Sequence, residues 1–211
     1  LARVMRAKTG DTVELFDGQG TSWTATVQAI QRNHVSLRLG QKQSEIISNK
    51  PIITLAVALP KGDRQKWLIE KITELGTDSL VPLTTTRSVA EPTAAAISRL
   101  QRGVIESCKQ SGRNRLLEIT QPQSLHNLLT TSSASLRILA CPDGTPMQSI
   151  LLKPIDNILI AIGPEGGFTD EEIRTANASG FAQMSLCQNI LRIETAAIAA
   201  AVIAGQCKNT C

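Results

Sequence analysis

The residues best suited to chemistry lie in two short segments near the C-terminal end of the sequence. The first is Gly163-Pro164-Glu165-Gly166-Gly167, and the second spans residues 187–195 and contains Arg192 and Glu194. Three glycines and a proline within five residues let a backbone bend sharply and approach a ligand closely. The two segments are therefore the first candidates for a ligand site, with one guanidinium and two carboxylates available to it.

Each segment follows an apolar run that is predicted to be a buried strand. Residues 158–162 are too few for a typical helix and rich in Ile, and residues 182–186 form the second run. Thr169 and Glu172 have the spacing of a capping box, so a helix should begin there, and Gly180 should end it. Two strands would thus deliver two loops to one edge of a sheet, where ligands bind in open α/β proteins.

The wider pattern predicts two domains, one of residues 1–50 and one of residues 51–211. Alternating runs at 12–16, 23–30 and 34–39, with a hairpin signal at Asp17-Gly18, favour a small β-barrel. Strands expected at 52–59, 79–83, 136–140, 158–162 and 182–186 alternate with helices expected at 64–75, 93–110 and 194–207. Asp63 should cap the first of these helices, and residues 121–135 should be a polar loop around one amphipathic turn. Such alternation indicates a doubly wound parallel α/β sheet.

Four motifs resemble one known family. The segments 163–167 and Leu191-Arg192-Ile193-Glu194-Thr195-Ala196 closely resemble the two signature motifs of bacterial 16S rRNA uridine-N3 methyltransferases. Residues 110–115 and the loop at 84–88 resemble further motifs of that family. These enzymes belong to the SPOUT superfamily. The resemblance implies a SPOUT-type parallel sheet with a C-terminal trefoil knot, preceded by a small PUA-like, RNA-binding β-barrel.

The resemblance also implies a reaction. The family transfers a methyl group from S-adenosylmethionine to N3 of a uridine, and that nitrogen must first lose its proton. A cation near the neighbouring carbonyl oxygens would stabilise the resulting anion. We expect Arg192 to be this cation, with Arg113 as a second candidate, and Glu165 or Glu194 to accept the proton or orient the arginine. Two alternatives stay open: a structural salt bridge between Arg192 and Glu194, and a Glu194 that only complements a helix dipole.

Residue by residue, the family's motifs imply a cofactor site and an RNA site. The expected cofactor-binding residues are Leu139, Pro142, Ile162, Gly163, Pro164, Glu165, Gly166, Gly167, Leu186, Cys187, Asn189, Ile190, Leu191 and Thr195. The expected RNA-binding residues are Arg3, Arg6, Arg87, Gln110, Arg113 and Arg115. Solvated loops and strand faces are the alternative for the basic residues.

The sequence departs from the family at Cys187 and Asn189, where members usually have Gly and Arg. This departure keeps a second reading open, in which the chain is an RNA-binding module without catalysis. A third reading retains the fold but methylates another RNA position, such as a ribose 2′-oxygen. The five cysteines include no CxxC pair and there are only two histidines, so we expect buried thiols and no metal site.

Bulk properties are compatible with an RNA-binding protein of the cytoplasm. The net charge is +4, and residues 1–50 hold seven basic and four acidic residues, which leaves +3 there. No apolar run approaches the roughly 18 residues of a membrane span, and no leader is visible. The last helix is rich in alanine, which either allows close packing in a homodimer or only reflects high helix propensity.

Overall fold

The computed structural model describes residues 7–44, 50–89, 92–150 and 154–208. Two compact units share the chain. The first is formed by Leu1–Ile47 with Gly112–Leu116, and the second by Ser48–Ser111 with Leu117–Cys211. Arg3 and Arg6, both predicted to contact RNA, lie outside the described residues.

The first unit is built on a three-stranded antiparallel sheet in the order β1-β2-β3. The strands are β1 (Thr12–Phe16), β2 (Thr21–Ile30) and β3 (Val35–Ser44), so the three expected strands and the hairpin are confirmed. The carboxylate of Asp17 closes the first turn by accepting hydrogen bonds from the backbone N–H groups of Gln19 (2.7 Å) and Thr21 (3.0 Å). These bonds lower the pKa of Asp17.

A short segment from much later in the chain completes the first unit. Gly112–Leu116 lies against the β1–β2 turn, where the N–H of Leu116 donates to the carbonyl of Gly18 (3.0 Å). The N–H of Gly20 donates to the carbonyl of Asn114 (3.1 Å). A Cβ on Gly18 would lie 2.9 Å from the Leu116 side chain, so the close approach depends on that glycine.

The second unit is organised around a seven-stranded parallel sheet. Its order is β10-β8-β9-β4-β5-β6, and β7 also pairs with β5. The strands are β4 (Ile52–Val57), β5 (Ser79–Thr84), β6 (Glu118–Ile119), β7 (Gln123–Ser124), β8 (Leu136–Pro146), β9 (Asn157–Ile162) and β10 (Ala182–Ser185). The predicted parallel α/β architecture is confirmed.

One strand is much longer than the sequence predicted. The strand expected at 136–140 continues to Pro146, because its pairing with β10 resumes at Thr145 after an irregularity. Gly144 permits this continuation: a Cβ there would lie 2.6 Å from the backbone of Met184. A pattern of side chains cannot reveal such a contact between two backbones.

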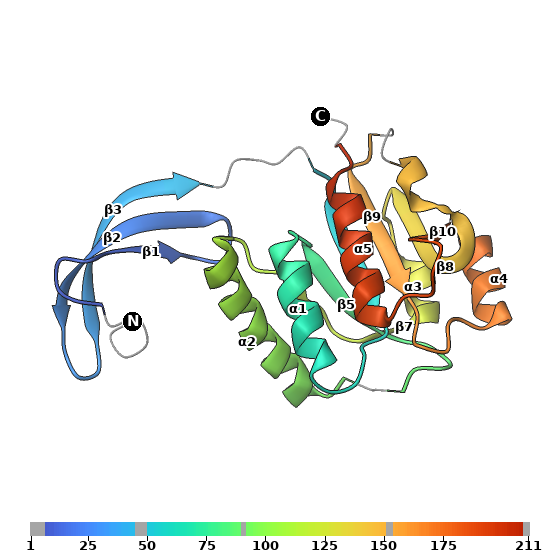
Figure 1. The fold of residues 1–211 in the computed structure, drawn as a ribbon, viewed down its shortest axis with the longest axis horizontal. Coiled ribbons are helices and arrows are strands. Elements are labelled where there is room, and N and C mark those ends of the chain that lie inside the picture. The colour runs from blue at the N-terminus through green and yellow to red at the C-terminus, as the bar shows by residue number, and fades with distance from the viewer. Residues whose placement is uncertain (1–6, 45–49, 90–91, 151–153, 209–211) are drawn as a thin grey trace. The chain divides into compact units, whose positions relative to one another are not determined.

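Helices cover both faces of this sheet (Figure 1). They are α1 (Arg64–Glu74), α2 (Ala94–Ser111), α3 (Leu125–Thr131), α4 (Asp170–Ala178) and α5 (Ile193–Gly205), with a short 3₁₀ turn, η1 (Met147–Ile150). α1 and α5 pack together on one face and α2 packs against α1, whereas α3 and α4 cover the other face. In the part of the chain that the structure describes, no helix is long and apolar enough to cross a membrane.

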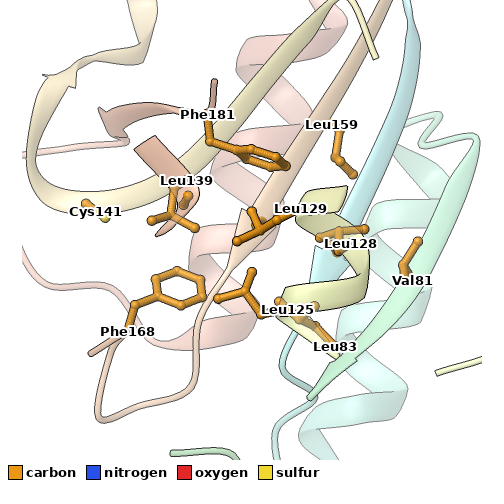
Figure 2. Close-up of a cluster of buried hydrophobic side chains, with 13 residues drawn as sticks. Val81, Leu83, Leu125, Leu128, Leu129, Leu139, Cys141, Leu159, Phe168 and Phe181 are labelled. Carbon is orange, nitrogen blue, oxygen red and sulfur yellow. The ribbon is translucent and has the colours of Figure 1, made fainter. Parts of the chain in front are cut away.

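A core cluster fills the space between the sheet and the helices α3 and α4. Figure 2 shows the three leucines of α3 among strand side chains such as Leu139 and Leu159, with Phe168 and Phe181 beside them. The cluster consists of Ala56, Val81, Leu83, Leu125, Leu128, Leu129, Leu139, Cys141, Leu159, Ala161, Phe168, Ala176 and Phe181. Because side chains alternate along a strand, neighbours of these residues face the α1 and α5 side.

Three local expectations need correction or refinement. Asp63 precedes α1, but its side chain makes no capping hydrogen bond. The polar loop expected at 121–135 contains α3, whose leucines enter the core, and Ser124 caps it by accepting from the N–H of Asn127 (3.2 Å). Four alanines of α5 are fully buried within the chain, so small side chains serve close packing against α1 and the sheet: Ala197, Ala200, Ala201 and Ala204.

Candidate active site

The two segments singled out in the sequence, 163–167 and 187–195, meet in one pocket of about 360 Å³ in the second unit. The turn at 163–167 follows β9, the segment at 186–191 follows β10, and residues 140–143 of β8 form a third side. All three stretches lie at or beyond the middle of parallel strands, toward their carboxyl ends. The pocket therefore occupies the edge of the sheet at which α/β proteins bind ligands.

The glycine turn owes its shape to backbone and capping contacts. Gly167 has a left-handed φ of 68°, and its N–H donates to the carbonyl of Pro164 (2.8 Å). The capping box is present as predicted: the N–H of Glu172 donates to Oγ1 of Thr169 (3.2 Å), and the N–H of Thr169 donates to Oε2 of Glu172 (2.8 Å). The start of α4 thus fixes the end of the turn.

The loop after β5 forms hydrogen bonds with the glycine turn and with the start of α4. Nη1 of Arg87 donates to the carbonyl of Gly166 (2.6 Å), and the N–H of Thr86 donates to Oε1 of Glu172 (2.8 Å). Partial burial opposes ionisation of Glu172, but the hydrogen bonds from Thr169 and Thr86 outweigh it and lower its pKa. Arg87, expected to contact RNA, also holds the pocket wall, a role that its sequence context did not reveal.

A charged group lies beside the pocket. Nη1 of Arg64, in the first turn of α1, is 2.6 Å from Oε1 of Glu165 and 3.8 Å from Oε2 of Glu194. The hydrogen bond from Arg64 lowers the pKa of Glu165, and the nearby charges of Arg192 and Lys61 act in the same direction. Sequence reasoning missed Arg64, and only its place at a helix start after a Pro-Lys-Gly break hinted at it.

Glu194 is 5% exposed and forms its ion pair with Arg64, whereas Arg192 is exposed at the N-cap of α5. Among the described residues, none gives a hydrogen bond to Oε2 of Glu194. A buried carboxylate of this kind is a poor candidate for exchanging protons with a ligand in the pocket, because it does not line it. The lowered pKa of Glu165 makes that carboxylate a weak base as well.

Most of the expected cofactor residues line the pocket. Twelve of them do so: Pro142, Ile162, Gly163, Pro164, Glu165, Gly166, Gly167, Leu186, Cys187, Asn189, Ile190 and Leu191. Leu139 instead belongs to the core cluster, and Thr195 is exposed outside the pocket lining. The lining also includes residues that were not among the expected cofactor-binding residues, namely Ala140, Cys141, Asp143, Phe168, Ile173, Gln183, Ile193 and Ala196.

The residues expected to contact RNA are spread over both units. Gln110 is exposed near the end of α2, and Arg87 is exposed beside the pocket. Arg113 and Arg115 belong to the first unit, in which Arg115 bridges to Gly18 and Gln19. Their roles, including the one suggested for Arg113 in catalysis, stay predictions.

Thiols occupy two environments. Cys108, Cys141 and Cys207 are buried, as expected, and burial raises the pKa of Cys141 to about 11. Cys187 is exposed in the pocket wall, contrary to the expectation of buried thiols, and its Sγ donates to the carbonyl of Asn189 (3.1 Å). Within the described ranges, no group of three or more His, Cys, Asp or Glu side chains could hold a metal ion.

Comparison with known proteins gives two family matches. A model described as an RNA methyltransferase domain matches residues 48–205, which is most of the chain. A second model, described as an RNA methyltransferase PUA domain, matches residues 1–40.

Similar sequences share one name. The ribosomal RNA small subunit methyltransferase E of Synechocystis is 35% identical over 202 residues, which cover 93% of this chain and 66% of that protein. The protein of the same name from Rickettsia conorii is 34% identical over 202 residues, covering 93% of this chain and 81% of its own length. The chain thus spans just under two thirds of the first relative.

Solved structures agree with the sequence comparison. A putative methyltransferase from Legionella pneumophila, in complex with the bound cofactor SAM, matches with a TM-score of 0.86 and 30% identity over 96% of this chain and 86% of that one. A ribosomal RNA small subunit methyltransferase E from Neisseria gonorrhoeae, bound to S-adenosyl methionine, matches with a TM-score of 0.86 and 27% identity over 95% and 84%.

Proposed function

Since the chain belongs to the RNA methyltransferase family, we propose that it transfers the methyl group of S-adenosylmethionine to N3 of a uridine in 16S rRNA of the small ribosomal subunit. The observation that carries this proposal is that the glycine turn and the segment at 186–191 line the same pocket. Neither segment alone would suffice. The names of similar proteins support rRNA as the substrate and S-adenosylmethionine as the methyl donor.

The pocket residues fit this cofactor. Apolar side chains such as Ile162, Leu186 and Leu191 provide walls for the adenine, and the turn at 163–167 offers backbone groups close to a ligand. A Cβ at Gly163 would lie 3.0 Å from the ring of Phe168, so the turn already packs tightly behind the pocket. The carboxylate of Asp143 suits the amine or the ribose hydroxyls. The volume lies within the range of cofactor pockets, roughly 300–1,000 Å³.

The cofactor supplies an electrophilic methyl group, and the chain's residues prepare the acceptor. Arg192 is our candidate for the cation that faces the uridine carbonyl oxygens and stabilises the anion left when water takes the N3 proton. Its neighbours Leu191 and Ile193 both line the pocket, and its charge reaches Glu165. Arg64 holds Glu165, so that carboxylate is better suited to orienting Arg192 than to removing a proton.

A direct test uses the purified protein, radiolabelled S-adenosylmethionine and small subunits that lack the modification. We expect label in 16S rRNA, and mass spectrometry of the digested RNA should identify N3-methyluridine. Arg192→Ala should lower kcat strongly and leave the cofactor Kd unchanged. Arg174→Ala is a matched control, because Arg174 is an exposed arginine on α4 that does not line the pocket. Equal turnover in both variants would remove Arg192 from the mechanism.

The same assay separates the alternatives. A ribose 2′-O-methyl product would show that the fold methylates another position. The exposed pair Cys187 and Asn189, which replaces the family's usual Gly and Arg, is the observation that favours a module without catalysis. RNA binding without any label transfer, together with no calorimetric response to S-adenosylmethionine, would establish that reading.

Fold and assembly details follow from the same membership. We propose that the C-terminal part of the sheet is threaded as a trefoil knot and that the three-stranded sheet belongs to a PUA-like barrel that binds RNA; the PUA family match supports the second point. We also propose that residues 1–50, together with Gly112–Leu116, and the remainder of residues 51–211 act as separate domains, that the enzyme is a homodimer and that it works in the cytoplasm. Light scattering of the purified protein tests the dimer, and a monomeric mass would exclude it.

A further inference from the structure

A second pocket, of about 410 Å³, lies in the same unit and has no assigned role. Three elements form it: the end of β5 with the loop that follows, the start of α3 and the start of α4. Its lining consists of Thr84, Thr85, Thr86, Ser124, Leu125, His126, Leu129, Thr169, Glu171, Glu172 and Thr175. Like the first pocket, it lies beyond the carboxyl ends of parallel strands, where ligands bind in this class of sheet.

The lining favours a ligand that carries hydrogen-bond donors and no negative charge. Six of the lining side chains carry hydroxyl groups, and none of the lining residues is Lys or Arg. Both carboxylate oxygens of Glu172 already accept backbone hydrogen bonds, but Glu171 remains an exposed acceptor. Oγ1 of Thr175 donates to the carbonyl of Glu171 (2.9 Å), which leaves its lone pairs to accept. Acceptors of this kind suit ribose hydroxyls and base N–H groups and repel a phosphate.

The two pockets are lined by residues that are adjacent in the sequence. Phe168 lines the first pocket and Thr169, the next residue, lines the second, so their Cα atoms are only about 3.8 Å apart. The core cluster lies beneath both, because Phe168 and Cys141 reach the first pocket and Leu125 and Leu129 reach the second (Figure 2).

The guanidinium of Arg87 lies between the two pockets. Arg87 directly follows Thr86 of the second pocket, and its Nη1 bonds the carbonyl of Gly166 in the first. Arg87 is exposed, and guanidinium groups favour phosphate oxygens. A cation therefore lies between the cofactor pocket and the second pocket.

We propose that the second pocket binds the ribose and base of a nucleotide adjacent to the target uridine, with the connecting phosphate near Arg87. This proposal rests on the proposed function, because it takes the strand in the second pocket to be the rRNA whose uridine meets the cofactor held in the first pocket. It names a subsite for sequence context, since the pocket would sense the neighbour of the target base.

The test measures binding of a short rRNA fragment by fluorescence anisotropy, with the parent protein and with Thr175→Trp, which fills the pocket. Thr175→Val removes only the hydroxyl. The matched control is Thr130→Trp, because Thr130 is also an exposed helical threonine whose Oγ1 donates to carbonyls of the preceding turn, those of Asn127 (3.0 Å) and His126 (3.2 Å), yet it lines neither pocket. Calorimetry with S-adenosylmethionine shows whether each variant keeps an intact first pocket.

We expect Thr175→Trp to raise the Kd for the fragment about tenfold, equivalent to one or two lost hydrogen bonds, and Thr130→Trp to bind like the parent. Fragments with one base removed at each position near the target locate the contact. At one position beside the target, base removal should weaken binding to the parent and have no further effect in Thr175→Trp.

Equal Kd values for Thr175→Trp and Thr130→Trp, or equal base-removal penalties in parent and Thr175→Trp, would overturn the inference. Methylation of small subunits by the parent is scored separately. A parent that binds the fragment but transfers no methyl group to small subunits would refute the proposed function and leave the binding comparison to decide the subsite.

Discussion

Replacing Gly167 with alanine should destabilise the protein, whereas the same change at the adjacent Gly166 should not. The two glycines line the pocket side by side, but only Gly167 has a left-handed φ, of 68°. A Cβ at Gly167 would meet nothing within 4 Å, so crowding plays no part there. At Gly166 the new Cβ would touch the Arg87 side chain at 3.4 Å, an ordinary contact. The pair therefore isolates backbone conformation from packing.

The magnitude follows from the left-handed penalty. Both variants lose the same unfolded-state entropy of a glycine, so that effect cancels in their difference. What remains is the steric penalty of placing alanine in the left-handed region, about 1–2 kcal/mol. For a chain of this size, each kcal/mol shifts Tm by roughly 2–4 °C. Gly167→Ala should thus melt about 2–8 °C below Gly166→Ala.

The assay is a thermal melt followed by circular dichroism, with and without S-adenosylmethionine. The cofactor should stabilise Gly166→Ala more than Gly167→Ala, because a strained turn presents its backbone groups less accurately. Two variants that melt at the same temperature would refute the reasoning, since they would show that residue 167 does not hold a left-handed conformation in solution.

Three further predictions concern the residues around the pocket. Leu139→Ala, in the core cluster, should lower the unfolding free energy by about 2–5 kcal/mol in urea melts, and a stability close to the parent's would contradict its full burial. The pKa of Glu172 is lowered, so its contribution to stability should be present above its ordinary pKa of 4.5 and be lost as the pH falls through the lowered value. Glu172→Gln should flatten that acid dependence of Tm, and an unchanged profile would exclude the carboxylate as its source. Arg64→Met should raise the pKa of Glu165 in an NMR titration, whereas Arg64→Lys should largely preserve it; equal midpoints in both variants would argue against the ion pair.

The sequence predicted the elements that follow local rules. Apolar runs at 158–162 and 182–186 became β9 and β10, and the Thr169–Glu172 capping box formed as its spacing required. The motifs also predicted which residues share a pocket, because a parallel sheet brings strand ends together at one edge.

Long-range geometry lay beyond sequence reasoning. Leu139 was expected to contact the cofactor, yet it is fully buried in the core cluster, whereas Pro142, three positions later on β8, lines the pocket. Arg64 lies 101 residues from Glu165, a separation at which no spacing rule operates. The helix α3 was too short and too polar at its start to stand out from a loop.

The inclusion of Gly112–Leu116 in the first unit has a practical consequence for dissecting this protein. The backbone enters that unit a second time, so a fragment cut after residue 47 would lack the strip that bonds Gly18 and Gly20. Studies of RNA binding by the isolated first unit would need a chimera that joins Gly112–Leu116 to the three-stranded sheet through an artificial linker. Proteolytic trimming would have to make three cuts, rather than one, to liberate the intact unit.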